Sequence, residues 1–103
     1  MTSNNTQYQT RKIGSNKGKP RVWLEGAILT DNGINHGMRF DVINYPQMLE
    51  IVINPQGARK IAGKPDRPII DMSAATITAS FDDSIKTVTV KPTNTGLLLI
   101  GVK

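Results

Sequence analysis

The stretch that decides the fold runs from Pro20 to Ile53 and reads PRVWLEGAILTDNGINHGMRFDVINYPQMLEIVI. Its first segment alternates, so that Val22 and Leu24 face one side of a strand while Trp23 faces the other. The next segment, residues 27–29, predicts a single helical turn. These first residues therefore predict a short strand followed by a brief helix.

The remainder of this stretch predicts a hairpin. Alternation resumes at residues 40–43, a turn is expected at 45–47, and residues 48–53 return as a second strand. Gly33 ends the helical turn, because glycine readily adopts the left-handed conformation of a helix C-cap. A unit this small cannot bury its apolar face alone, so it needs a partner.

The second half of the chain supplies that partner. Residues 69–72, 85–90 and 97–102 predict strands, while 74–81 fits either a strand or a helical turn. Matching 21–25 to 67–71 and 48–53 to 97–102 predicts an internal repeat whose offset drifts slightly from one match to the next. Within this repeat Arg39 and Lys86 occupy equivalent places, each opening a hairpin strand.

The domain boundaries follow from composition. Residues 1–19 are polar and basic, which predicts a disordered arm. The folded β domain spans 20–103, with a first unit at 20–53, a connector at 54–66 and a second unit at 67–103. The connector carries turn clusters and one expected helical turn at 58–64.

The formal charge of +5 is concentrated in the arm. Five basic residues and no acid lie between Met1 and Arg21, whereas eight basic and eight acidic residues balance each other from Val22 onward. A basic, flexible arm on a neutral body favours contact with a polyanion, although it also fits a solubilising tail.

Several classes of protein are disfavoured by composition. The absence of cysteine excludes disulfides, thiolate catalysis and cysteine-based zinc sites. We expect a cytoplasmic protein, since the chain shows no secretion signal and no apolar run of the roughly 20 residues that span a bilayer. We expect no cofactor and no metal site, because Asp82 and Asp83 also fit an ordinary turn.

The first unit resembles the AbrB-type swapped-hairpin family, and within it the SymE-like branch. The resemblance is carried by Pro20, by Leu24-x-Gly26, by Gly33-Ile34, by Gly37 and by Phe40-x-Val42. Ile28-Leu29 replaces the tryptophan-leucine pair of the family's helical turn. A second, degenerate copy in one chain is similar to MraZ-like tandem proteins.

This resemblance implies a mostly β, small swapped-hairpin barrel built from two strand–turn–hairpin units. Such barrels dock on DNA, and most members of the family are transcriptional regulators or antitoxins. The hairpins can swap within one chain or between two chains, and we expect a homodimer. The SymE-like branch implies an alternative, a toxin that acts on RNA.

Catalysis has little support in the sequence. His36 is the single histidine, and it lies in a bend between Asn35 and Gly37, so no second histidine can complete an acid–base pair. We therefore expect no enzyme, with a ribonuclease as the alternative. A protein-binding inhibitor module of phage or plasmid origin is a further alternative.

Nucleic-acid binding, with double-stranded DNA as the favoured form, is the function that we predict. Lysine and arginine side chains would contact phosphates and release counterions. Trp23, Phe40 and Phe81 are expected in the core, which disfavours a stacking platform for single strands, with Trp23 and Tyr45 left open as exceptions. The predicted contact residues are Arg11, Lys12, Lys17, Lys19, Arg21, Arg39, Arg59, Lys60, Lys64 and Lys86.

Overall fold

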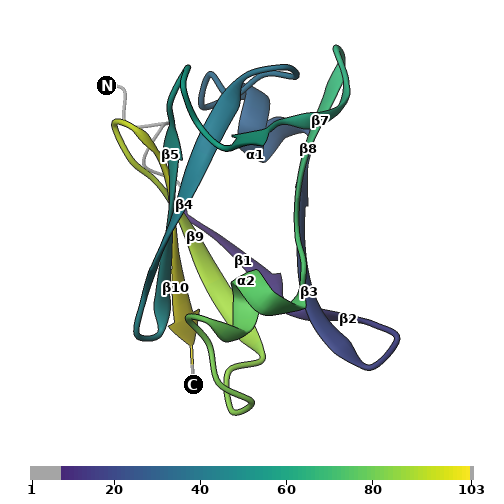
Figure 1. The fold of residues 1–103 in the computed structure, drawn as a ribbon, viewed down its shortest axis with the longest axis vertical. Helices are drawn as coiled ribbons and strands as arrows, with labels where there is room; N and C mark the ends of the chain where they lie inside the picture. The colour runs from purple at the N-terminus through teal and green to yellow at the C-terminus, as the bar shows by residue number, and fades with distance from the viewer. Residues whose placement is uncertain (1–7, 103) are drawn as a thin grey trace.

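Two β-sheets pack face to face around one hydrophobic core (Figure 1). The computed structural model describes residues 8–102. The larger sheet has six strands in the order β1-β9-β10-β5-β4-β6, and the smaller has four in the order β2-β3-β8-β7. The strands are β1 (Gln9–Lys12), β2 (Gly14–Asn16), β3 (Lys19–Glu25), β4 (Arg39–Tyr45), β5 (Met48–Ile53), β6 (Arg59–Lys60), β7 (Ala62–Lys64), β8 (Arg67–Met72), β9 (Thr87–Pro92) and β10 (Gly96–Val102).

Two single-turn helices lie at opposite ends of the space between the sheets, α1 (Ala27–Thr30) and α2 (Ala74–Thr78). The segment 74–81, whose sequence fits either a strand or a helical turn, begins with a helix in the structure. Residues 8–102 contain no helix with the length and apolar character that crossing a membrane requires.

The core forms because apolar residues alternate along the central strands of both sheets. In the four-stranded sheet Val22 and Leu24 of β3 are fully buried, and in the six-stranded sheet Leu49 and Ile51 of β5 are as well. Side chains at alternate positions point to the same face of a strand. The core therefore lies between the sheets, and each sheet keeps one face toward solvent.

The two halves of the chain are related by one constant offset, which carries Trp23 onto Asp71 and Glu50 onto Leu98. Trp23 of β3 pairs with Asp71 of β8, and Glu50 of β5 pairs with Leu98 of β10, so each pair joins equivalent positions of the two halves. An approximate two-fold axis therefore passes through the centre of both sheets. All of these pairings are made within one chain.

The register corrects two details of the predicted repeat. The offset does not drift, and Arg39 is not the counterpart of Lys86. Lys12 pairs with Thr87 while Lys60 pairs with Arg39, so the counterpart of Arg39 is Thr87. The predicted alignment was thus wrong by one residue at this position. Because neighbouring residues of a strand point to opposite faces, Arg39 and Lys86 do not occupy equivalent faces of the sheet.

The expectation of a disordered arm over 1–19 is wrong for the residues that the structure describes, and residues 1–7 lie outside them. β1 pairs with β9, and the backbone N–H of Ile13 donates to the carbonyl of Lys86 at 2.9 Å. β2 forms a hairpin with β3 whose tip residues Lys17 and Gly18 both have positive φ, as in a type I′ turn. Ladder hydrogen bonds order this polar segment.

The predicted connector over 54–66 is part of the second repeat. Its segment 58–64 forms the strands β6 and β7 instead of a helical turn. Ile61 is buried and donates its backbone N–H to the carbonyl of Met38, as its counterpart Ile13 does to Lys86. The repeat therefore begins with the strands β1 and β6, ahead of the units that we predicted.

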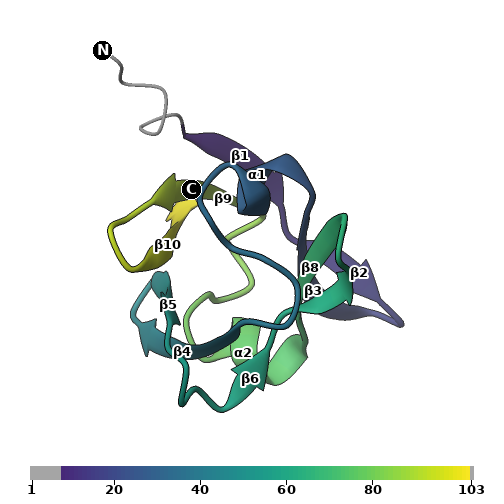
Figure 2. The ribbon, with the colours of Figure 1, turned by 90° about the horizontal axis from the view of Figure 1, so that it is seen from above.

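The closed swapped-hairpin barrel is not confirmed, because the strands form two separate sheets. The sheets are joined at two corners, where β1 continues through Ile13 into β2 and β6 continues through Ile61 into β7. Seen from above, the six-stranded sheet curls so that its outer strands approach the four-stranded sheet (Figure 2).

Candidate nucleic-acid interface

The outer face of the four-stranded sheet gathers charged side chains around the single tryptophan of the chain. Because Val22 and Leu24 point inward, Arg21, Trp23 and Glu25 of β3 point outward. Alternation on β8 has the same effect and turns Arg67, Ile69 and Asp71 outward.

Five of these residues form one connected group, the Trp23 cluster (Arg21, Trp23, Glu25, Arg67 and Asp71). Arg21 donates two hydrogen bonds of 2.7 Å to the carboxylate of Asp71, and its guanidinium lies 4.7 Å from the centre of the Trp23 ring. The Trp23 indole N–H donates to Glu25 at 2.8 Å, and Arg67 lies 3.7 Å from the same carboxylate. The cluster is thus held by charge-assisted and cation–π contacts.

The electrostatics of the cluster are set by the pair of Arg21 and Asp71. Hydrogen bonding from Arg21 lowers the pKa of the Asp71 carboxyl, against the opposing effect of burial. The same hydrogen bond raises the pKa of the Arg21 guanidinium. Asp71 thus faces Arg21, and Glu25 faces Arg67. Because each acid of the cluster is next to an arginine, the cluster presents little net negative charge to solvent.

Lysines occupy the rim of this face. Lys17 and Lys19 belong to the hairpin of β2 and β3, and Lys64 belongs to the hairpin of β7 and β8. Among the described residues, none of these three ammonium groups has a hydrogen bond or an ion pair with another side chain. Their charge is therefore available to an external anion.

Two shallow hollows flank the Trp23 cluster and are related by the approximate two-fold axis. One, of about 420 Å³, is lined by Lys19, Arg21, Asp71 and Ser73 among others. The other, of about 540 Å³, is lined by residues at the equivalent positions, which are Arg67, Ile69, Trp23 and Glu25. Both hollows thus have a cation at the same position of the repeat, which is Lys19 in one and Arg67 in the other.

The structure brings four of the ten predicted contact residues to this sheet, namely Lys17, Lys19, Arg21 and Lys64. Arg67 was missed by the sequence reasoning. Its signal was available, since Arg67-Pro68 repeats Lys19-Pro20 at the same offset that relates Asp71 to Trp23. The predicted alignment placed Arg67 opposite Arg21 instead, which hid this equivalence.

The other six predicted residues do not join this face. Arg39 donates to the carbonyl of Gly57 at 2.8 Å, and Arg59 donates to the hydroxyl of Thr76 at 2.9 Å, so both arginines tie loops and helices to the sheet. The remaining four lie on or beside the six-stranded sheet: Arg11 and Lys12 on β1, Lys60 on β6, and Lys86 just before β9.

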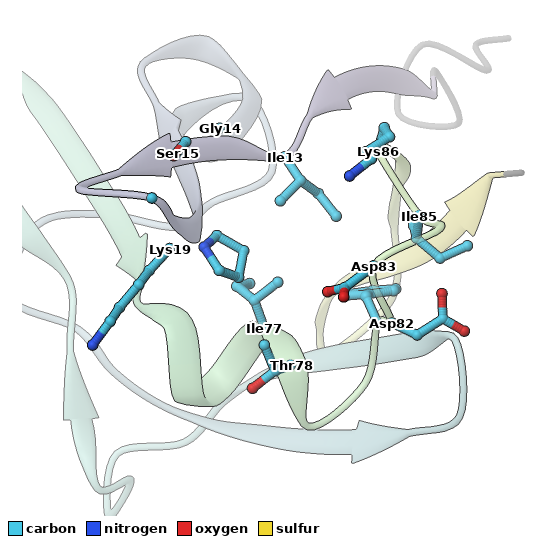
Figure 3. Close-up of a pocket in the computed structure, with 13 residues that line it drawn as sticks. Ile13, Gly14, Ser15, Lys19, Ile77, Thr78, Asp82, Asp83, Ile85 and Lys86 are labelled. Atoms are coloured by element: carbon cyan, nitrogen blue, oxygen red, sulfur yellow. The ribbon is translucent and has the colours of Figure 1, made fainter.

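Lys86 lines a third hollow, of about 220 Å³, between β2, α2 and the loop before β9 (Figure 3). Figure 3 shows Lys86 and Lys19 on opposite sides of this hollow, with Asp82 and Asp83 on the loop that carries Lys86. Among the described residues, no group of three or more histidine and acidic side chains is placed to hold a metal ion.

The placement of Trp23 in the core is wrong, whereas Phe40 and Phe81 are buried as expected. The Trp23 side chain is 43% exposed. The strand alternation already turned Trp23 away from Val22 and Leu24, and its size alone suggested burial. Because aromatic rings provide stacking surfaces for bases, the exposure of Trp23 adds a chemical feature to this face.

Comparisons with protein-family models, with curated proteins and with solved structures find no match to this chain.

Proposed function

We propose that this protein binds nucleic acid through the outer face of the four-stranded sheet, and that it acts on double-stranded DNA as a regulator of transcription or an antitoxin-like factor. The observation that carries the proposal is the pair of equivalent hollows, with Lys19 in one and Arg67 in the other. Cations at related positions suit a duplex, whose two strands are themselves related by local two-fold symmetry.

The spacing of these cations fits one duplex. Lys19 and Arg67 each precede the central pair of Trp23 and Asp71 by four residues, on antiparallel strands. At about 3.3 Å per residue their backbones lie roughly 26 Å apart, which is less than the ~34 Å of one helical turn. Both hairpins can therefore reach phosphates of the same DNA segment.

A relationship to AbrB-type swapped-hairpin regulators belongs to the same proposal. Its support is the repeated unit of strand, helical turn and hairpin, together with the pairing of β3 with β8 and of β5 with β10. The proposal assigns no catalytic residue and no cofactor. Cleavage of RNA that is lost in His36→Ala would contradict it and would favour the toxin alternative.

Binding to a random duplex of about two helical turns, followed by fluorescence anisotropy at increasing salt, tests the proposal. We expect the logarithm of affinity to fall linearly with the logarithm of salt concentration. Lys19→Glu and Lys64→Glu should each reduce the slope by about one, since each removes one phosphate contact. The matched control Lys86→Glu, which changes the same charge away from this face, should leave the slope unchanged.

A second candidate, binding of single-stranded RNA, is favoured by the exposed Trp23 with Arg21 over its ring. Single strands bind by stacking their bases on aromatic rings, at about 1–3 kcal/mol per base. Trp23→Ala should then abolish binding to RNA while duplex binding persists. Equal, salt-independent affinity of all variants for every nucleic acid, or no binding at low salt, would refute both candidates.

A further inference from the structure

Over the strands β10, β5 and β4, the outer face of the six-stranded sheet is largely apolar, although it faces solvent. Six outward side chains on three neighbouring strands form this apolar band: Ile43, Tyr45, Met48, Leu98, Ile100 and Val102. Ile43 is 40% exposed and Val102 is 43% exposed. Contiguous apolar surface of this kind marks a site of interaction with another molecule.

One row of residues across this face also carries two opposite charges. The register places Lys91, Leu98, Glu50 and Ile43 side by side on β9, β10, β5 and β4. Lys91 and Glu50 are separated by Leu98, so two strand spacings, or about 10 Å, lie between their backbones. Glu50 accepts a hydrogen bond from Tyr45, and Lys91 lies over the ring of Tyr8.

We propose that a second copy of this chain docks on the apolar band, with a two-fold axis that runs parallel to the strands and over β10. Rotation about this axis places Leu98 and Ile100 against the same residues of the partner. It also places Lys91 opposite the partner's Glu50, and Glu50 opposite the partner's Lys91. The face therefore complements itself, because Leu98 and Ile100 meet the same apolar residues and each charge of the row meets its opposite. A symmetric dimer interface requires this kind of match.

Other orientations and other occupants fit less well. An axis perpendicular to the strands and along this row would place Glu50 against the partner's Glu50, which is repulsive. A polyanion would meet Glu50 and the apolar band at the centre of this surface. A second copy places Lys91 and Glu50 against their opposite charges and covers Leu98, Ile100 and Met48 at the same time.

The size of the contact predicts a reversible dimer. Figure 2 shows the sheet curling away at β1 and β6, and β4 lies opposite the partner's β1 when the axis runs over β10, so the contact is made by β9, β10 and β5 of each copy. Three strands at about 4.8 Å and six residues at about 3.3 Å give a footprint of roughly 15 × 20 Å. This is smaller than a stable specific interface, so we expect a weak dimer with a dissociation constant of roughly 0.1 mM or higher.

Sedimentation velocity of the full chain without nucleic acid, from about 1 µM to 1 mM, tests the proposal. We expect a monomer–dimer equilibrium in the wild type. Ile100→Lys should raise the dissociation constant by about 100-fold, because it brings two lysines together at the axis. Glu50→Lys and Lys91→Glu should each raise it about tenfold, and the double variant should restore it to within about threefold.

The control is Lys64→Glu, which changes charge on the opposite sheet and should not affect dimerisation. Circular dichroism of each variant verifies that the sheets are intact. The charge-exchanged double variant keeps the test decisive even where Ile100→Lys does not fold. A monomer at every concentration, a dimer that tolerates Ile100→Lys, or a double variant weaker than either single variant would overturn the proposal.

Discussion

At the residue scale, the centre of the four-stranded sheet is where the two repeats differ most in chemistry. Trp23 in the first repeat corresponds to Asp71 in the second, and Arg21 corresponds to Ile69. The rim is different, since Lys19 corresponds to Arg67 and keeps its charge. The two repeats therefore offer equivalent cations at the rim, whereas the aromatic ring is present on one side of the centre only.

The pair of Arg21 and Asp71 makes stability depend on pH. Because Arg21 lowers the pKa of Asp71 in the folded state, the stabilisation is present above the ordinary carboxyl pKa of about 3.9. It is lost as the pH falls through the lower, folded pKa. We expect Asp71→Asn to lower the melting temperature by a few degrees at neutral pH and by less in acid, as measured by circular dichroism.

Asp41 is a second carboxylate whose contacts make the stability of the fold depend on pH. Hydrogen bonds from the Ala58 N–H and from Asn54 lower its pKa. Asp41→Asn together with Asp71→Asn should therefore flatten the acid dependence further than either change alone. A melting curve of Asp71→Asn that runs parallel to the wild type at every pH would show that the contact contributes nothing in solution.

At the scale of elements, β1 and β6 are short edge strands that bend into the opposite sheet. β1 covers the edge of β9, and β6 covers the edge of β4. After the bend, β2 and β7 cover the edges of β3 and β8. Each edge pair thus shields a longer strand from pairing with another chain, which limits aggregation.

Deleting residues 2–12 should therefore destabilise the protein, although this segment is polar. The deletion removes β1 and exposes the edge of β9, so we expect the melting temperature to fall by at least about 5 °C, or roughly 1 kcal/mol. Replacing Arg11 and Lys12 by glutamine keeps the strand and removes the charge. This control should melt near the wild-type temperature, and an equal loss in both proteins would contradict the role of the strand.

Most elements of the core could be predicted from sequence, because Val22 and Leu24 or Leu49 and Ile51 alternate visibly. β1, β2, β6 and β7 could not, since polar residues are ordered there by ladder hydrogen bonds with strands far along the chain. One signal of these strands is nonetheless present in the sequence. The tripeptide Arg-Lys-Ile occurs at 11–13 and again at 59–61, where both copies turn from one sheet into the other.

The candidate site was predicted only in part for the same reason. Local composition identified Lys17 and Lys19 as basic, but not that Lys64 and Arg67 lie on the same sheet. That proximity arises from the pairing of β3 with β8, two strands that belong to different halves of the chain. The internal bonds of Arg39 and Arg59 were equally invisible, because Gly57 and Thr76 reach them only through the fold.

At the scale of the whole molecule, the two repeats are interleaved. Each repeat contributes strands to both sheets, and the central pairs of both sheets join one repeat to the other. Neither a sheet nor a repeat can therefore keep its core when the other is lost. The molecule should behave as a single cooperative unit.

Urea unfolding tests this cooperativity with two probes. Trp23 is the single tryptophan and reports on the four-stranded sheet, while far-ultraviolet circular dichroism reports on all strands. We expect the two normalised curves to coincide, with one midpoint and one slope. A fluorescence transition that precedes the loss of strand signal would show that the four-stranded sheet opens alone.

The solvent faces of the two sheets point in opposite directions along an axis on which the molecule extends 30 Å (Figure 1). Two copies joined back to back would hold their tryptophans at the two far ends of the assembly, with the thickness of both molecules between them. With DNA bound at each outer face, as proposed, such an assembly would join two separate DNA segments and close a loop between distant sites. Its effect would then scale with protein concentration, because only the paired form can crosslink.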